Sequence, residues 1–228
     1  MIVIKNHRLR EVLRRALPFV VLPATVLLGA VFVDEKKHLV VSLGVAVLSV
    51  IFFLTGFEKR RIGSRRAVMV AIMTAMCVIG RFIPVFKPIT ALSVISAMYL
   101  GGEAGFTVGA MSALISDFYF GQGPWTPFQM LAFGLCGLFA GYLAPALKKS
   151  RVLLLAYGAL AGVAYSFIMD VWTVLWYNGN FDFSLYLAAL VTAVPHTAVY
   201  VISNVAFLAL AARPFGEKLE RISIKYGL

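Results

Sequence analysis

Long apolar runs, separated by short polar or basic stretches, make up most of the chain. Most of these runs are long enough for a helix to cross a hydrocarbon core about 30 Å thick at 1.5 Å per residue. The fourth run is shorter and ends at Gly101–Gly102, so we expect it to be tilted, broken or re-entrant. We predict eight helical segments, at residues 14–33, 38–56, 66–83, 89–101, 103–120, 127–147, 152–177 and 185–212. The pattern indicates an all-α membrane protein with about eight transmembrane segments.

A basic stretch at residues 58–66 divides these segments into two groups. Residues 1–57 hold an amphiphilic lead and a hairpin of two almost featureless apolar helices. Residues 67–213 hold six segments and nearly all of the glycine, proline and polar residues found within apolar runs, and residues 214–228 form a basic tail. We therefore expect a six-helix domain preceded by a two-helix hairpin.

Composition and charge place this protein in a bilayer and orient it there. The chain is 61% hydrophobic and 14% charged, whereas a soluble domain is closer to half apolar and a quarter charged. The net charge of +11 comes from short basic clusters between apolar runs, which favours membrane orientation over a nucleic-acid partner. With a cytoplasmic N-terminus, 17 of the 21 Lys and Arg residues lie on the inner side. We predict that both termini are cytoplasmic.

Three alanines, Ala67, Ala71 and Ala75, recur at the start of the third segment with a spacing of four residues. This spacing places their methyl groups on one helix face. A face of small side chains lets another helix approach closely in a membrane. The partner helix could belong to this chain or to a second protein, and the spacing leaves both interpretations open.

The outer loop around residues 119–129 combines helix-breaking residues with aromatic and amide side chains. Trp125 is typical of an interfacial anchor. However, an aromatic face and several hydrogen-bonding groups, as in small-molecule sites, are offered together by Gln122, Trp125, Thr126 and Gln129. A second outer loop adds Trp176 and Asn178 on the same side.

Four ionisable residues, Arg81, Lys87, Asp117 and Asp170, lie near the outer ends of predicted segments. Charges at such depths are usually paired or face a wet cavity. We expect Arg81 to pair with Asp117 or Asp170, either to hold helices together or to form part of a site. His196 follows a proline in the last segment and is weak evidence for a ligand site on its own.

The sequence contains none of the common catalytic motifs. It has no phosphate-binding loop of the Gly-x-x-x-x-Gly-Lys-Ser/Thr type, no His-Glu-x-x-His and no Gly-x-Ser-x-Gly. Its two cysteines, Cys77 and Cys136, lie inside apolar runs and are interpreted as small core residues. We therefore expect no enzyme activity, no metal site and no intrinsic cofactor.

The six-segment region 66–212 resembles the substrate-binding S component of energy-coupling factor (ECF) transporters, which are vitamin importers of the ABC class. The likeness is carried by the spaced alanines, by the stretch 104–118, and by the stretch 120–130 running on to Gly137-x-x-x-Gly141. The hairpin lies outside this resemblance.

The resemblance implies an importer subunit in the plasma membrane of a prokaryote. Such a subunit captures a vitamin at the outer face and works with a membrane T component and two cytosolic ATPases, which use the ATP. Ala67, Ala71 and Ala75 then become the docking face for the T component. The candidate substrate-binding residues are Arg81, Lys87, Asp117, Gln122, Trp125, Gln129, Asp170, Trp176, Asn178 and His196.

The outer loop resembles those of S components for cobalamin most, so cobalamin is the first substrate that we expect. Folate, pantothenate, riboflavin and a queuosine precursor are alternatives. An ion-coupled secondary transporter is the main rival function, although Asp117 and Asp170 lie near helix ends rather than in mid-membrane. A ligand-free membrane scaffold and a membrane enzyme are further rivals.

Overall fold

A computed structural model describes residues 7–32, 38–55, 60–84 and 87–226. Within these ranges all regular structure is helical. The elements are α1 (His7–Ala16), the π-helical turn η1 (Leu17–Val21), α2 (Leu22–Phe32), α3 (His38–Thr55), α4 (Arg60–Gly80), α5 (Ile89–Leu100), α6 (Gly102–Phe120), α7 (Thr126–Tyr142), α8 (Ala144–Lys149), α9 (Arg151–Asn178) and α10 (Phe183–Tyr226). The predicted all-α membrane protein is confirmed.

Each predicted segment overlaps at least one helix, but several boundaries differ, and the segment 14–33 takes in the end of α1, η1 and α2. The segment 127–147 is interrupted at Leu143, which separates α7 from the short α8. Helix α10 runs through Pro195 and Pro214 to Tyr226, so the residues of the predicted tail largely continue the helix. Among the described helices, residues 8–30, 151–178 and 183–225 are long and apolar enough to cross a membrane, and two shorter apolar helices accompany them.

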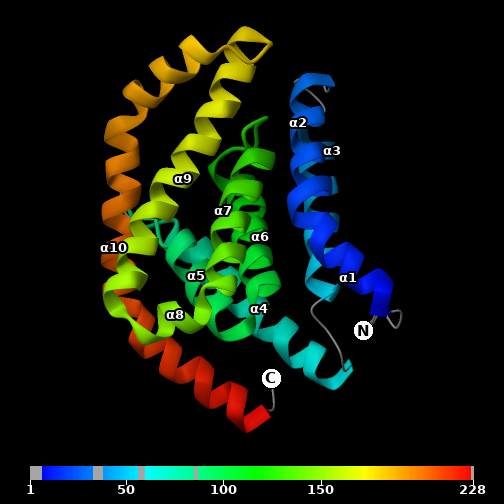
Figure 1. Cartoon of the computed structure of the whole chain (residues 1–228), viewed down its shortest axis with the longest axis vertical. Coiled ribbons are helices and arrows are strands. Elements are labelled where there is room, and N and C mark those ends of the chain that lie inside the picture. Colours follow the sequence, from blue (N-terminus) through cyan, green and yellow to red (C-terminus); the bar gives the residue numbers. More distant parts are fainter. Residues whose placement is uncertain (1–6, 33–37, 56–59, 85–86, 227–228) are drawn as a thin grey trace.

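Figure 1 shows α6 and α7 side by side at the centre, with α9 and α10 on one flank and the hairpin of α2 and α3 on the other. Small residues allow this close central packing. A β-carbon at Gly137 would collide with the backbone of Gly105, and one at Gly109 would collide with the backbone of Phe133. The glycines on the two helices therefore allow their backbones to touch, as small residues do in membrane helix pairs.

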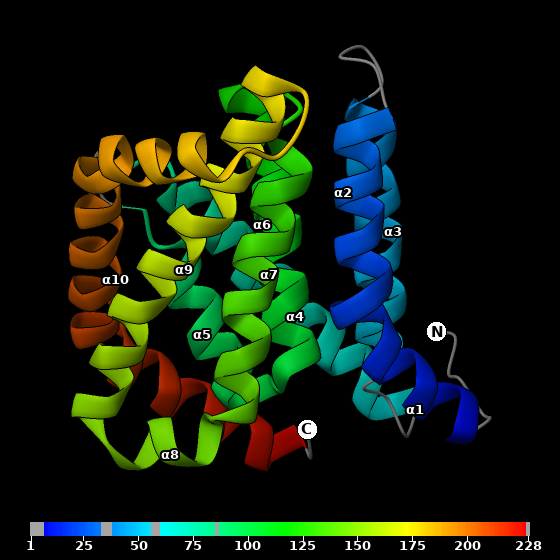
Figure 2. The same cartoon turned by 45° about the horizontal axis from the view of Figure 1, so that its top comes forward.

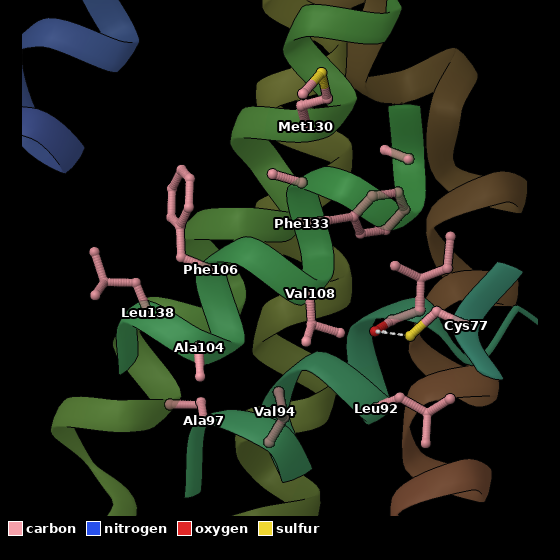
Figure 3. Close-up of a cluster of buried hydrophobic side chains, with 14 of the residues drawn as sticks. Cys77, Leu92, Val94, Ala97, Ala104, Phe106, Val108, Met130, Phe133 and Leu138 are labelled. Carbon is pink, nitrogen blue, oxygen red and sulfur yellow. Dashed lines mark hydrogen bonds between the residues drawn. The ribbon is translucent and has the colours of Figure 1, made fainter. Parts of the chain in front are cut away.

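The apolar core lies between α5, α6 and α7, as Figure 3 shows. Phe106, Met130 and Phe133 are large members of this core, and each is at most 2% exposed. Every residue of α5 except Tyr99 is buried. This burial explains the short fourth segment: a helix surrounded by protein does not have to span the full lipid thickness. Gly101 ends α5 with φ of +95°, a conformation that favours glycine.

The hairpin packs against the six-helix domain through specific contacts. Phe52 of α3 meets Phe106 of α6 edge to face, with ring centroids 5.4 Å apart. The Thr107 hydroxyl donates a hydrogen bond to the Ser49 carbonyl at 3.2 Å. At one end of α6, Glu103 forms an ion pair with Arg14 of α1. The hairpin is therefore an integral part of the described bundle.

The start of α1 and the end of α10 lie at the same end of the molecule (Figures 1 and 2). The loops at residues 121–125 and 179–182 lie at the opposite end. This arrangement agrees with an even number of crossings. The assignment of the first end to the cytoplasm stays a prediction from the basic clusters.

Candidate functional site

An ion pair joins three helices at the end that carries the loops at residues 121–125 and 179–182 (Figures 1 and 2). Arg81 follows α4, and its Nη1 lies 2.5 Å from Oδ1 of Asp117 on α6 and donates to Oγ of Ser116. The hydroxyl of Thr126, at the start of α7, donates to the other carboxylate oxygen of Asp117 at 2.8 Å. Asp117 is fully buried. The expected pairing of Arg81 is therefore confirmed for Asp117 and not for Asp170.

This ion pair acts as a clamp beneath the loop at residues 121–125. A buried ion pair is tolerated when additional hydrogen bonds satisfy its remaining atoms, and here Ser116 and Thr126 supply them. The backbone amide of Gly121 also donates to the Asp117 carbonyl at 2.8 Å. The clamp fixes where the loop leaves α6 and where α7 begins.

Beside the clamp, Lys87 and His196 line an open cavity of about 370 Å³ together with Tyr200 and Ser203. The Lys87 ammonium donates to the carbonyl of Arg81 at 3.0 Å. The Ser203 hydroxyl accepts from the Lys87 amide at 2.9 Å, which attaches the loop before α5 to α10. Burial and the positive charge of Arg81 lower the pKa of Lys87. The sequence analysis did not identify Tyr200 or Ser203.

A row of aromatic rings leads from the apolar core to this cavity. Phe133 of α7 stacks on Tyr165 of α9 with centroids 4.3 Å apart and planes 21° apart. Tyr165 in turn lies 4.5 Å from Tyr200 of α10. No spacing in the sequence predicts this row, because its members come from three different helices.

Three of the predicted site residues each hold a buried polar atom that has no hydrogen-bond partner among the residues that the structure describes. These atoms are Oε1 of Gln122, Oε1 of Gln129 and Oδ2 of Asp170. Gln122 uses its amide nitrogen to donate to the Leu114 carbonyl at 3.0 Å, so only its oxygen is unpartnered. Burying an acceptor without a donor costs free energy of folding. In native structures such groups usually accept a hydrogen bond from water or from a ligand. These residues can therefore accept hydrogen bonds from a bound molecule.

The tryptophans form a second aromatic group at the same end. Trp125 meets Trp172 of α9 at 6.0 Å, and Trp172 stacks near Trp176 at 6.2 Å. Trp172 and Trp176 also line a narrow crevice against Gly29 of α2. The hairpin thus approaches the loop at residues 121–125, which the sequence did not predict.

Asn178 is the exposed last residue of α9, next to the turn that follows this helix. Its amide donates to the Asn180 carbonyl at 3.1 Å, and the next helix is capped by Asp182, which accepts from the Leu185 amide at 3.0 Å. Hydrogen bonds from Ser184 and Leu185 lower the pKa of Asp182. The hydrogen bond that the structure gives Asn178 therefore stabilises the turn and does not join it to the cavity at Tyr200.

The three alanines open onto an apolar groove of about 610 Å³ on the side of the bundle. Ala71 and Ala75 are exposed, and Ala67 is partly exposed. Val50 and Phe53 of α3 line the opposite wall. The predicted small face is therefore open in the described chain, and the hairpin borders it. Among the described residues, no three His, Cys, Asp or Glu side chains gather to hold a metal ion.

Residues 61–220 match the model of a protein family described as "ECF-type riboflavin transporter, S component". The match spans more than two thirds of the chain. It begins within the first turn of α4 and excludes the hairpin. No curated protein and no solved structure matches the chain.

Proposed function

Since the chain belongs to the family of ECF-type riboflavin transporter S components, we propose that it captures riboflavin or a closely related flat vitamin at its outer face. In this proposal a T component and two ATPases complete the importer and supply the energy. The observation that carries the choice of ligand is the aromatic row Phe133–Tyr165–Tyr200, which ends at an open cavity.

The chemistry of a flavin suits this row and the polar groups that lie at the same end of the bundle. Its planar ring system stacks on aromatic side chains at the separations that aromatic pairs prefer. Its imide N–H and the hydroxyls of its side chain are donors, and the unpartnered oxygens of Gln122 and Gln129 are acceptors. Ser203 and Lys87 add hydrogen-bonding groups at the rim of the cavity.

Riboflavin replaces cobalamin as the first candidate on two grounds. The family match names riboflavin, whereas the preference for cobalamin rested on the outer loop alone. The cavity of about 370 Å³ is also near the lower end of the range for small-molecule sites, roughly 300–1,000 Å³. A corrinoid is much bulkier than a flavin and would need a larger space.

The groove at Ala67, Ala71 and Ala75 is the proposed docking face for the T component. Its alanines are accessible from the side of the bundle, and the groove is lined almost entirely by apolar residues. Small side chains allow a partner helix to approach the backbone closely, and close packing is what favours helix association over lipid contact.

Titration of the purified full-length protein with riboflavin tests the ligand, because bound flavin changes its fluorescence. We expect one saturable site, with weaker or absent binding of cobalamin, folate and pantothenate. Tyr200→Ala should weaken binding by at least about tenfold, which corresponds to one stacking contact of roughly 1.4 kcal/mol. Tyr177→Ala is the matched control, since Tyr177 is 81% exposed.

Three other outcomes would change the proposed vitamin, the proposed site or the proposed transport mechanism. Tight binding of cobalamin alone would reverse the choice of vitamin. Binding of riboflavin that survives Tyr200→Ala unchanged would place the site elsewhere. Uptake into vesicles that needs an ion gradient and no ATPase would reject the ECF mechanism in favour of an ion-coupled transporter.

A further inference from the structure

A second cavity lies at the opposite end of the molecule from the aromatic row. It has a volume of about 470 Å³ and is lined by the end of α5, by α8, by the start of α9 and by the later part of α10. Figures 1 and 2 show this last part of α10 turning across the end of the bundle. The proposed uptake of a vitamin at the outer face does not use this cavity.

The cavity has an apolar half and a charged half. Met98, Leu154 and Leu208 are buried and form apolar walls. The charged half contains three cations and two carboxylates, namely Lys148, Arg151, Arg213, Glu217 and Glu220. A ligand that fills both halves must be amphiphilic and must carry charge at one end.

Among the described residues, the contacts found for two of the three cations, Lys148 and Arg151, are not with carboxylates. The Lys148 ammonium lies 4.2 Å above the ring of Tyr99. Arg151 donates to the main-chain carbonyl of Ala209 at 3.2 Å. Neither an aromatic ring nor a carbonyl neutralises a cation. Arg213 does pair with Glu217 at 3.0 Å, but both side chains are exposed, and such a pair contributes little.

The position of the cavity indicates where its ligand comes from. Lys148, Arg151 and Arg213 belong to the basic clusters that predict the cytoplasmic surface of the membrane. Leu210 on the rim is 77% exposed, so the apolar half opens toward the region that lipid chains occupy. Basic pockets between membrane helices on this side are suited to lipid head groups.

We propose that this cavity binds a glycerophospholipid of the inner leaflet through a phosphoethanolamine head group. The phosphate lies at Lys148 and Arg151, where charge-assisted hydrogen bonds are available. The ammonium group lies at Glu217 and Glu220, and the first carbons of one acyl chain contact Leu154 and Leu208. The two carboxylates favour this zwitterionic head over a purely anionic one.

A lipid in this position would bridge α8 and α9 to the terminal part of α10. That part already packs closely on α5, because a β-carbon at Gly216 would collide with the Tyr99 hydroxyl. The lipid phosphate would also contact Lys148, whose ammonium lies over the face of the same Tyr99 ring. Bound phosphatidylethanolamine should therefore stabilise the cytoplasmic end of the bundle.

Native mass spectrometry of the full-length protein, purified in detergent and titrated with dioleoyl phosphatidylethanolamine, tests this proposal. We expect one tightly held lipid. Lys148→Gln and Arg151→Gln should each weaken binding by about tenfold. Lys149→Gln is the matched control, because Lys149 is the exposed neighbour that does not line the cavity. Glu217→Gln should reduce the preference for phosphatidylethanolamine over phosphatidylglycerol.

Three results would overturn the proposal. Equal weakening by Lys148→Gln and Lys149→Gln would show only a general attraction to basic surface. Equal affinity for phosphatidylcholine would contradict the role of the carboxylates and ammonium. Binding of glycerophosphoethanolamine or inorganic phosphate as tight as that of the lipid would assign the cavity to a soluble phosphate compound. Unchanged riboflavin binding by Lys148→Gln establishes that the variant is folded.

Discussion

Arg81 lies 2.5 Å from Asp117, although 36 positions separate the two residues along the chain. The contact joins the end of α4 to the end of α6, and Thr126 extends it to α7. The loop that contains Gln122 and Trp125 begins just after α6, close to Asp117, and ends at Thr126. A single polar cluster therefore fixes both ends of the loop at residues 121–125.

Breaking this ion pair on one side should destabilise the protein strongly. Arg81→Met leaves the buried Asp117 carboxylate without its cation, which costs about 3–5 kcal/mol in comparable cases. The double variant Arg81→Met/Asp117→Leu removes both charges and should recover much of that loss. Thermal unfolding in detergent measures both, with Arg221→Gln as an exposed control. Equal unfolding temperatures for the single and double variants would contradict the conclusion that Arg81 compensates the buried charge of Asp117.

Removing an unpartnered acceptor should weaken riboflavin binding without lowering the stability of the protein. Gln129→Leu takes away a buried oxygen that has no donor, so the ligand-free protein should be as stable as the original or slightly more stable. The same change should weaken riboflavin binding by about tenfold, the value of one hydrogen bond to a buried group. Parallel unfolding and fluorescence titrations check this. Loss of stability with unchanged affinity would give Gln129 a purely structural role.

The ring of Tyr200 should matter more than its hydroxyl. Tyr200→Phe keeps the stacking surface beside Tyr165 and removes only a long hydrogen bond of 3.4 Å. We expect its riboflavin affinity to fall by less than about threefold, whereas Tyr200→Leu should lose at least about tenfold. A larger loss for the phenylalanine variant would indicate that the hydroxyl, not the ring, contacts the ligand.

Filling the alanine groove should abolish assembly without affecting capture. Ala71→Trp places a large ring where the groove requires a methyl group. We expect riboflavin binding to persist, while co-purification with the T component and ATPase-dependent uptake are lost. Ile72→Trp is the matched control, because Ile72 is 47% exposed and does not line the groove. Normal uptake by Ala71→Trp would move the docking face to another helix.

The hairpin should behave as a packed part of the bundle. Phe52 is fully buried against Phe106, so Phe52→Ala leaves a cavity and should cost about 3–5 kcal/mol. Val47→Ala, on the same helix but 60% exposed, should change stability little. Chemical unfolding in detergent distinguishes the two. Equal small effects would mean that α3 is only loosely attached.

Several site features could be predicted because charge and residue type are local properties. The need to pair a charged residue within an apolar run singled out Arg81 and Asp117, and the choice between Asp117 and Asp170 remained open. The alanine face followed from the helical period alone. Whether these residues bind a vitamin or a partner protein stays a prediction, since their roles depend on molecules outside the chain.

The sequence by itself determined that this is an all-α membrane protein, where its helices lie and which family it resembles, because apolar run length and motif spacing are read along one dimension. Only the tertiary structure decided that Phe133, Tyr165 and Tyr200 form one row, that α5 is an enclosed central helix, and that α3 borders the alanine groove. These features depend on how helices distant in the sequence pack together. In a membrane that choice rests on close contacts between small and polar side chains, which apolar periodicity does not encode.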